Sequence, residues 1–221
     1  MAKVRLTPEL MAMRAAQELP EGAVVNLGIG MPTLVANHIP PDRLVILHSE
    51  NGVVGYGPFP PEGQGDPDVV NAGGEMATLK PGACFVHHAD SFAIIRGGHV
   101  DVAILGAYQV SEQGDLANWM IPARGIGSIG GAADLAAGAR KLIALMEHTT
   151  RDGQPRILRR CTYPLTGRRC VRLVITDLAV IEVTPRGLLL KELAPGWTAK
   201  EVQELTEPEL LLAPDLRAIE V

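Results

Sequence analysis

The residue best placed for covalent chemistry is Glu50, which follows an apolar run over residues 44–47. Such a run is typical of a buried strand of the parallel kind, and Asn51-Gly52 is typical of the turn that ends it. Open α/β sheets place their reacting groups at the carboxyl ends of strands. A carboxylate held there loses part of its hydration, which makes the anion a better base or nucleophile. The local pattern alone also fits a solvated loop acid or a helix cap.

A second candidate is the glycine turn Gly28-Ile29-Gly30, which follows an expected strand over residues 23–27. A strand, a glycine turn and a helix start can together hold an anion through free backbone N–H groups. The pattern is no dinucleotide fingerprint, because the third glycine is missing and Pro32 lacks a donor. Gly28 and Gly30 therefore line a substrate site or simply make a tight turn between strand and helix.

A third candidate is Gly130-Gly131, which stands before a helix expected over residues 132–139. The first N–H groups of a helix have no partner within it, and glycine leaves them open to approach. Such groups can stabilise negative charge that develops during a reaction. The same glycines would also suit close packing of a helix against a strand.

The histidine pair His87-His88 does not indicate a metal site. We expect it to end a strand over residues 84–87, where adjacent side chains point to opposite faces and cannot easily share an ion. One ring should then face inward and the other outward. We expect a structural role for His48, and a core position for Cys84.

The elements that must position these residues alternate between strand and helix, which favours an open, mostly parallel α/β sheet with helices on both faces. A capped helix should begin at Thr7-Pro8, and a capping box at Thr198 should open the last helix. Between residues 52 and 68 we expect an extended loop that walls the site. The expected strands are 23–27, 44–47, 84–87, 102–105, 142–146 and 171–175, with a late hairpin of 180–184 and 188–190; further helices are expected at 31–39 and 91–96.

Bulk composition sets the class of protein. The 221 residues, 47% of them hydrophobic, suit one globular domain over 1–221. Aromatic residues make up 4% and the net charge is −5, which disfavours nucleic-acid binding. No apolar run is long enough to span a bilayer, so we expect no membrane partner. Three cysteines, none in a Cys-x-x-Cys pair, favour reduced thiols and a cytoplasmic protein.

Four motifs together resemble those of the B (or β) subunit of the class I CoA transferases. They occur in the family's order, and the resemblance runs from about Val4 to about Glu204. One departure is Ala133, where the family often has Met. The motifs are Ser49-Glu50-Asn51-Gly52 with the residues up to Pro58, the run from Val70 to Glu75, the run from Gly127 to Leu135, and Met146-Glu147-His148 followed by Cys161 to Gly167.

The resemblance implies roles for the candidate residues. Glu50 is expected to be the catalytic nucleophile, and the Gly131 N–H a donor to the oxyanion. Asn51, Gly28, Gly30 and Gly130 are expected to bind the substrates. Glu75 and Glu147 are the competing acids, although neither ends an apolar strand as cleanly. Arg96 and Arg124 are the basic residues considered for a second substrate carboxylate.

The activity implied is transfer of CoA from succinyl-CoA or another acyl-CoA to a 3-oxoacid such as acetoacetate or 3-oxoadipate, through a glutamyl-CoA thioester. No metal and no cofactor is expected. The expected partners are the A (or α) polypeptide of the CoA transferase, in an α₂β₂ assembly, and small carboxylic acids with acyl-CoA. Two alternatives remain open: another reaction on the same scaffold, such as acyl-CoA hydrolysis or sugar-phosphate isomerisation, and a non-catalytic regulatory role.

Overall fold

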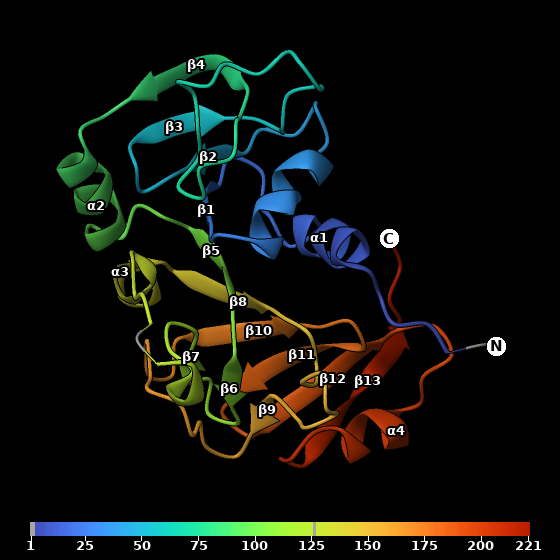
Figure 1. Ribbon diagram of the computed structural model, residues 1–221. Helices are drawn as coiled ribbons and strands as arrows, with labels where there is room; N and C mark the ends of the chain where they lie inside the picture. Colours follow the sequence, from blue (N-terminus) through green and yellow to red (C-terminus); the bar gives the residue numbers. More distant parts are fainter. Residues whose placement is uncertain (1–2, 126) are drawn as a thin grey trace.

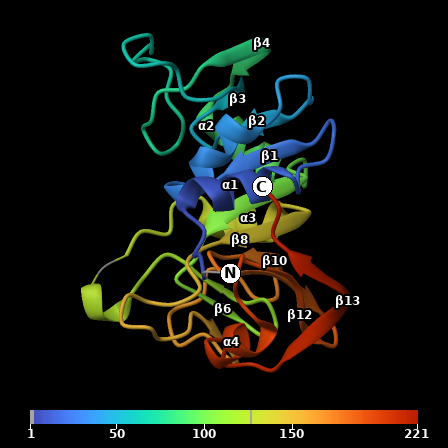
Figure 2. The same cartoon turned by 90° about the vertical axis from the view of Figure 1, so that its right-hand side faces the viewer.

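The computed structural model describes residues 3–125 and 127–221, and its main feature is a ten-stranded sheet (Figure 1). Neighbouring strands follow the order β13-β12-β11-β10-β8-β5-β1-β2-β3-β4. Figure 2 shows these strands stacked from β4 at one end of the molecule to β13 at the other. Their bounds are β1 Val24–Leu27, β2 Ile46–His48, β3 Val53–Tyr56, β4 Leu79–Phe85, β5 Val102–Gly106, β8 Lys141–Leu145, β10 Val171–Ile175, β11 Ala179–Thr184, β12 Gly187–Leu193 and β13 Leu210–Ala218.

The middle of this sheet is parallel and contains a topological switch point. Strands β10, β8, β5, β1 and β2 run in one direction. From β1 the chain passes to β2 on one side, and later returns to β5 on the other side of β1. Ligands of open α/β sheets bind outside the carboxyl ends of the strands at such a reversal. The fold therefore favours a site beyond the ends of β1, β2 and β5.

Helices cover both faces of the sheet, as the alternation of elements predicted. Val102 and Ile104 of β5 belong to the core beneath α1 (Pro8–Ala16) and the 3₁₀ helix η1 (Met31–His38). Ala103 and Leu105 belong to the opposite core, with α2 (His88–Arg96), α3 (Ala132–Gly138) and α4 (Ala199–Glu204). Successive residues of a strand face opposite sides, so one apolar strand supplies both cores. The expected mostly parallel α/β sheet is confirmed.

The helix signals at the two ends of the sequence are also confirmed. The Thr7 hydroxyl accepts a hydrogen bond from the Leu10 N–H, and Pro8 is the first residue of α1. At α4, the Thr198 hydroxyl accepts from the Glu201 N–H while the Glu201 carboxylate accepts from the Thr198 N–H. This is the expected capping box.

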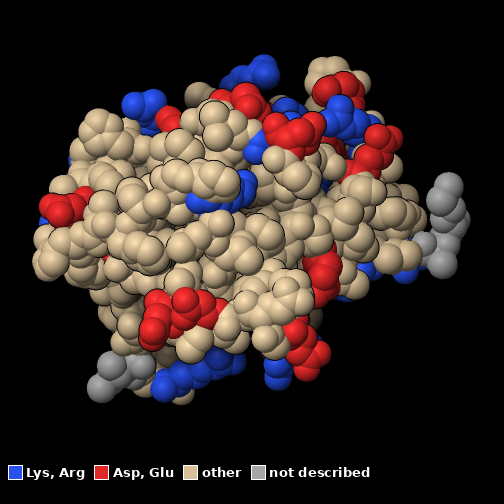
Figure 3. Space-filling view, turned by 90° about the horizontal axis from the view of Figure 1, so that it is seen from above, with Lys and Arg blue, Asp and Glu red and all other residues tan. Residues whose placement is uncertain are grey.

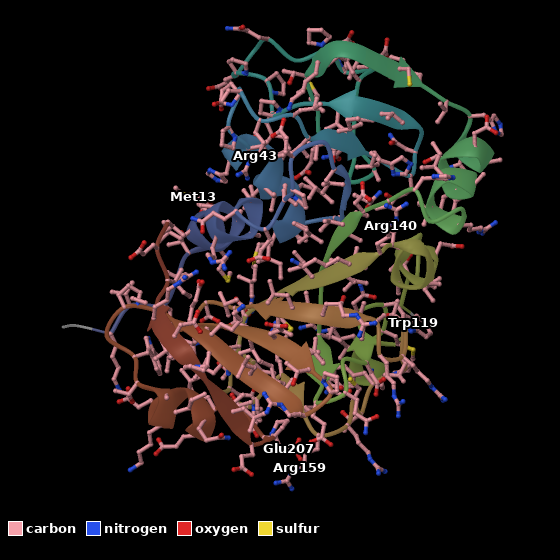
Figure 4. The ribbon with its side chains drawn as sticks, turned by 180° about the vertical axis from the view of Figure 1, so that it is seen from behind. Met13, Arg43, Trp119, Arg140, Arg159 and Glu207 are labelled. Carbon is pink, nitrogen blue, oxygen red and sulfur yellow. The ribbon has the colours of Figure 1, made fainter. Side chains whose placement is uncertain are left out.

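A small second sheet of order β7-β6-β9 braces the segments that lead to the site. Its strands are β6 (Gln109–Ser111), β7 (Leu116–Ala117) and β9 (Ile157–Leu158). The Trp119 indole N–H donates to the Leu165 carbonyl at 3.3 Å, just after β7. Beyond β9, the Arg159 backbone N–H donates to the Glu207 carboxylate at 3.1 Å; Figure 4 shows both residues at one end of the molecule.

Several expected boundaries are wrong. The segment 52–68 is not all loop, because β3 occupies Val53–Tyr56 and pairs antiparallel with β2. Two glycines in Gly52-Val53-Val54-Gly55 hid this strand from a reading based on composition. Strand β4 begins at Leu79 and ends at Phe85, earlier than expected. The helix expected after Gly30 is a 3₁₀ helix, and β13 was not expected at all.

Strand β4 forms an exposed edge, which overturns the expectation for Cys84. This thiol is exposed rather than part of the core, as are Leu79 and Phe85 on the same strand. Figure 3, which views the molecule from above, shows charged side chains mainly around the rim of this face. An edge strand lacks a neighbour on one side, so an apolar residue in it need not be covered.

Candidate functional site

Glu50 opens onto a cavity of about 560 Å³ at the carboxyl ends of the parallel strands. The wall is built from the segments that follow β1, β2, β5 and β8, together with the approach to α3. These segments meet because the carboxyl ends of parallel strands share one edge of the sheet. The lining residues include Gly28, Ile29, Met31, Glu50, Gly106, Tyr108, Asn118, Arg124, Ser128, Gly130, Gly131, Glu147 and Arg156.

Glu50 itself is half-buried in a tight turn between β2 and β3. The turn depends on Gly52, whose φ of 114° lies in a region that favours glycine, and whose missing side chain allows the Val86 carbonyl to approach. The Glu50 Oε2 atom accepts a hydrogen bond of 3.2 Å from the Asn26 side-chain amide. Asn26 of the sheet therefore holds the carboxylate on one side, and the other side is open to the cavity.

The glycine pair before α3 lies directly against this carboxylate. A side-chain carbon built on Gly131 would lie 3.5 Å from Glu50 Oε1 and 3.2 Å from the Phe92 ring. Gly130 has a φ of 50°, which lets the chain turn sharply into the helix. Within the parts of the chain that the structure describes, no group accepts a hydrogen bond from the Gly131 N–H. The structure thus brings together the two residues predicted to be catalytic.

The predicted substrate-binding residues divide into two groups. Gly28 and Gly130 line the cavity. Gly30 is not among the lining residues; it stands before η1, and its carbonyl accepts hydrogen bonds from Thr33. Asn51 is not among them either, because its side chain is exposed and donates to the Val70 carbonyl at 2.8 Å. Asn51 thus fastens the loop after β3 to the Glu50 turn.

Each of the competing acids contacts another side chain. Glu147 lines the cavity but forms an ion pair of 3.2 Å with Arg156. Glu75 accepts a hydrogen bond of 3.0 Å from the Asn71 side chain and is not among the lining residues. Burial first, and then the charges of Glu50 and Glu75, raise the pKa of the Tyr56 hydroxyl, which is buried on β3.

Of the two arginines expected to bind a second substrate carboxylate, one lies in the cavity and the other lies outside it. Arg124 lines the cavity, from the short 3₁₀ helix η2 (Pro122–Arg124). Arg96 lies outside it, where its exposed guanidinium pairs with Asp134 at 2.7 Å. Arg156 lines the cavity as well, where it pairs with Glu147.

The expectation for the histidine pair is wrong in its geometry. His87 stands before α2 and its ring accepts from the Ala89 N–H, while His88 begins the helix and packs against Phe92. Both are exposed, rather than one inward and one outward. Residues 3–125 and 127–221 contain no group of three or more His, Cys, Asp or Glu side chains that could hold a metal ion. No helix in those ranges is long and apolar enough to cross a membrane.

Sequence reasoning missed Asn26, which makes direct contact with the Glu50 carboxylate. One signal in the sequence could have identified it, because Asn26 interrupts the apolar run Val24-Val25-Asn26-Leu27. The structure shows that Asn26 is fully buried. A buried amide in the middle of a strand needs polar partners, so its position points to a polar network. His48, also fully buried, is one of those partners.

Comparison with known proteins agrees with this fold. Residues 9–205 match the family described as Coenzyme A transferase. The chain is 49% identical to the B subunit of 3-oxoadipate CoA-transferase from Acinetobacter baylyi, over 94% of this chain and 96% of that one. It is 51% identical to the B subunit of succinyl-CoA:3-ketoacid coenzyme A transferase from Helicobacter pylori, over 91% and 97%.

The fold has solved counterparts too. An acyl-CoA transferase from Escherichia coli O157:H7 superposes with a TM-score of 0.77 at 21% identity, covering all of this chain and 44% of that one. This likeness concerns the fold alone. The chain belongs to the coenzyme A transferase family, and its relatives place it with the B subunits of that family.

Proposed function

We propose that this chain is the catalytic B subunit of a CoA transferase that works through a glutamyl-CoA thioester on Glu50. The observation that carries the proposal is the juxtaposition of the Glu50 carboxylate with Gly131, whose N–H has no acceptor among the described residues. A carboxylate beside a preorganised donor suits nucleophilic attack on a thioester, because the donor stabilises the oxyanion that forms. An isomerase would need a base but no such acyl-enzyme.

The reaction proceeds in balanced steps. Glu50 attacks the thioester carbonyl of an acyl-CoA, which gives an acyl-glutamyl anhydride and CoA thiolate. The thiolate attacks the glutamyl carbonyl, forms the glutamyl-CoA thioester and releases the first acid. A second carboxylate then repeats these steps in reverse and leaves with CoA. The sequence of steps needs neither metal nor redox cofactor, and it predicts ping-pong kinetics.

The acceptor is proposed to be a 3-oxoacid, with succinyl-CoA as the donor. Support comes from the relatives, whose names specify 3-oxoadipate in one case and a 3-ketoacid with succinyl-CoA in the other. Arg124 supplies positive charge in the cavity, which suits the second carboxylate of succinate or 3-oxoadipate, whereas the charge of Arg156 is paired with that of Glu147. Acetoacetate lacks that carboxylate. An Arg124→Gln complex should therefore lose more affinity for 3-oxoadipate than for acetoacetate.

A second polypeptide, the α chain of the transferase, is proposed to complete the site. The relatives are named as B subunits, and an α₂β₂ assembly would follow the usual closed symmetry of oligomers. The cavity in this chain is open to solvent, and a partner over it would keep water from the anhydride and the thioester. We also propose a cytoplasmic location, in keeping with three free cysteines among the described residues.

The test is to trap the intermediate. The purified complex with the α chain is incubated with succinyl-CoA alone, then treated with borohydride or hydroxylamine and analysed by peptide mass spectrometry. The modified peptide should span Glu50. A Glu50→Gln complex should stay unlabelled, while Glu62→Gln, at an exposed loop carboxylate, should label normally. A label on Glu75 or Glu147, or full transfer by this chain without its partner, would contradict the proposal.

A further inference from the structure

A continuous chain of buried hydrogen bonds runs behind Glu50 and away from the cavity. The Asn26 amide nitrogen lies 3.2 Å from Glu50 Oε2 and 3.2 Å from His48 Nδ1. On the other side of the imidazole ring, His48 Nε2 lies 3.0 Å from the Ser91 hydroxyl. That hydroxyl lies 3.0 Å from the Ser49 carbonyl. Asn26, His48 and Ser91 are each fully buried.

The acceptors around Asn26 fix the orientation of its amide. Its Nδ2 atom faces three acceptors, Glu50 Oε2, His48 Nδ1 and, at 3.1 Å, the His48 carbonyl. Its Oδ1 atom has no hydrogen-bond partner among the described residues. Turning the amide over would set Oδ1 against a carboxylate and a carbonyl, which repel it. The amide must therefore donate toward Glu50.

The orientation of Asn26 in turn fixes the tautomer of His48. Because the Asn26 amide nitrogen can only donate, His48 Nδ1 must accept. The ring proton then lies on Nε2 and is donated to Ser91 Oγ, whose own proton goes to the Ser49 carbonyl. Burial lowers the pKa of His48, and the contact with Ser91 offsets part of that effect, so the ring is held neutral. The ring proton and the hydroxyl proton thus each have one assigned place, while the two N–H protons of Asn26 are shared among three acceptors.

We propose that His48 is a positioning residue for the reaction, which keeps the Asn26 amide turned so that its N–H points at Glu50 Oε2. The inference rests on the proposed function, in which Glu50 is the nucleophile. His48 acts only through Asn26, since no hydrogen bond joins the imidazole to the Glu50 carboxylate among the described residues. Ser91 secures the ring from the far side.

The geometry also assigns the two carboxylate oxygens. Oε1 faces Gly131, which lines the cavity, so we assign it as the atom that attacks the acyl-CoA carbonyl. Oε2 then becomes the carbonyl oxygen on the glutamyl side of the anhydride. When CoA thiolate attacks that carbon, the C–S bond forms, negative charge moves onto Oε2, and collapse expels the first acid as its carboxylate. An Asn26 N–H on Oε2 stabilises this charge as it develops. The amide is thus catalytic, and His48 preorganises it.

The decisive variants differ in which ring nitrogen they imitate. His48→Leu removes the acceptor for Asn26. His48→Asn can place an amide oxygen near the position of Nδ1, whereas His48→Gln reaches toward Nε2. Loss of a hydrogen bond to a charged group corresponds to a rate effect on the order of 10- to 100-fold. In the complex with the α chain we expect His48→Leu to lower kcat by that factor with the KM for acyl-CoA changed less than about twofold.

Partial rescue separates positioning from simple stability. His48→Asn should recover most of the lost kcat and His48→Gln should not, with folding checked by circular dichroism and complex formation by size-exclusion chromatography. Equal activity of the two amide variants, or a higher activity of His48→Gln, would overturn the proposal. This comparison decides the matter even if His48→Leu fails to fold. Wild-type kcat in a folded His48→Leu complex would overturn it as well.

A spectroscopic measurement needs no turnover. In the complex carrying ¹⁵N-labelled histidine in this chain, the His48 signal, assigned by its absence in His48→Asn, should show a protonated Nε2 and an unprotonated Nδ1 near neutral pH. A protonated Nδ1 or an imidazolium would overturn the assignment. The trapping experiment distinguishes the two levels of inference: a label on Glu50 with an inert His48 overturns only the positioning role, whereas an unlabelled Glu50 overturns the function itself.

Discussion

Glu50 and Gly131 lie so close together that a small change in either residue should affect the other. The Glu50 side chain lies between the Asn26 amide on one side and the Gly131 backbone on the other. The length of the side chain at residue 50 and the missing side chain at residue 131 should therefore have the largest effects on the reaction rate. Both can be changed without altering any charge or any strand.

Shortening the nucleophile tests its position. Glu50→Asp keeps the charge but withdraws the carboxylate from Gly131 by about 1 Å, and a misplacement on that scale can cost on the order of a hundredfold in rate. We expect kcat to fall on the order of a hundredfold or more, while the KM for acyl-CoA changes little. Steady-state kinetics of the complex measure this. Turnover within a few-fold of wild type would mean that another group is the nucleophile.

The two simplest substitutions of Gly131 separate donor from space. Gly131→Pro removes the N–H and, like alanine, adds a carbon 3.2 Å from the Phe92 ring, while the native φ of −83° is close to that of proline. One oxyanion donor contributes roughly 3 kcal/mol, so kcat should fall about a hundredfold. Gly131→Ala keeps the N–H but presses a methyl group on Phe92, and should lose less. Equal losses in the two variants would mean that the filled space accounts for the effect and the donor does not, because proline fills the same space.

At this scale the sequence was informative where a motif is contiguous. Glu50, Gly130 and Gly131 stand in short runs whose residue types carry the chemistry, and all three line the cavity. Asn26 and Arg156 could not be identified in the same way, because their roles depend on contacts with residues far away in the chain. Gly30 and Asn51 stand beside residues that line the cavity, yet their contacts serve the local turns.

Among the elements, the turn between β2 and β3 has a strict requirement for glycine at residue 52. A side-chain carbon on Gly52 would meet the Val86 carbonyl at the distance of a severe clash, and the residue has a φ of 114°. This carbonyl belongs to the segment that follows β4. The position of the nucleophile thus depends on a strand pair that contributes no side chain to the cavity.

Gly52→Ala should therefore destabilise the protein by more than about 2 kcal/mol, because steric conflict adds to backbone strain. The matched control is Gly63→Ala, at a φ of 75° with open space around it, where strain acts alone. Urea denaturation followed by circular dichroism compares the two. Equal losses of stability would show that the Val86 contact yields at little cost.

Elements with long apolar runs were predictable, and elements that depend on distant partners were not. Strand β10 was located to the residue, and the capping box of α4 followed from Thr198 and Glu201. Strand β3 was missed because two glycines resemble loop composition, although pairing with β2 and β4 overrides that preference. Edge strand β13 includes Pro214 and alternates little, so its pairing with β12 could not be read locally.

At the scale of the whole molecule, a buried polar cluster around His148 ties three parts of the chain together. Its ring contacts the Thr176 and Thr206 hydroxyls, each at 2.9 Å, and its backbone N–H donates to Asp177 at 2.7 Å. Asp177 in turn pairs with Arg5 near the start of the chain. The cluster joins the end of β8 to the β10–β11 turn and the end of α4.

This cluster predicts how stability varies with acidity. Burial lowers the pKa of His148 to about 4, below the ordinary value of 6.5. Between these two values the unfolded chain binds more protons than the folded one, so stability falls as the pH falls from 6.5 toward 4, by roughly 3 kcal/mol in all. Urea unfolding across that range measures the slope. A His148→Gln variant should lose this contribution, and an unchanged slope in the variant would contradict the assignment.

The three thiols of the molecule differ in a way that provides a practical handle. Burial raises the pKa of Cys161 to about 12 and also raises that of Cys170, which suppresses the thiolates that react with alkylating reagents. Cys84 is exposed on β4, opposite Val54 of β3. A maleimide dye at neutral pH should therefore attach at Cys84 first. Because β3 leads directly out of the Glu50 turn, such a dye would report when an incoming acyl-CoA or a second polypeptide disturbs that turn.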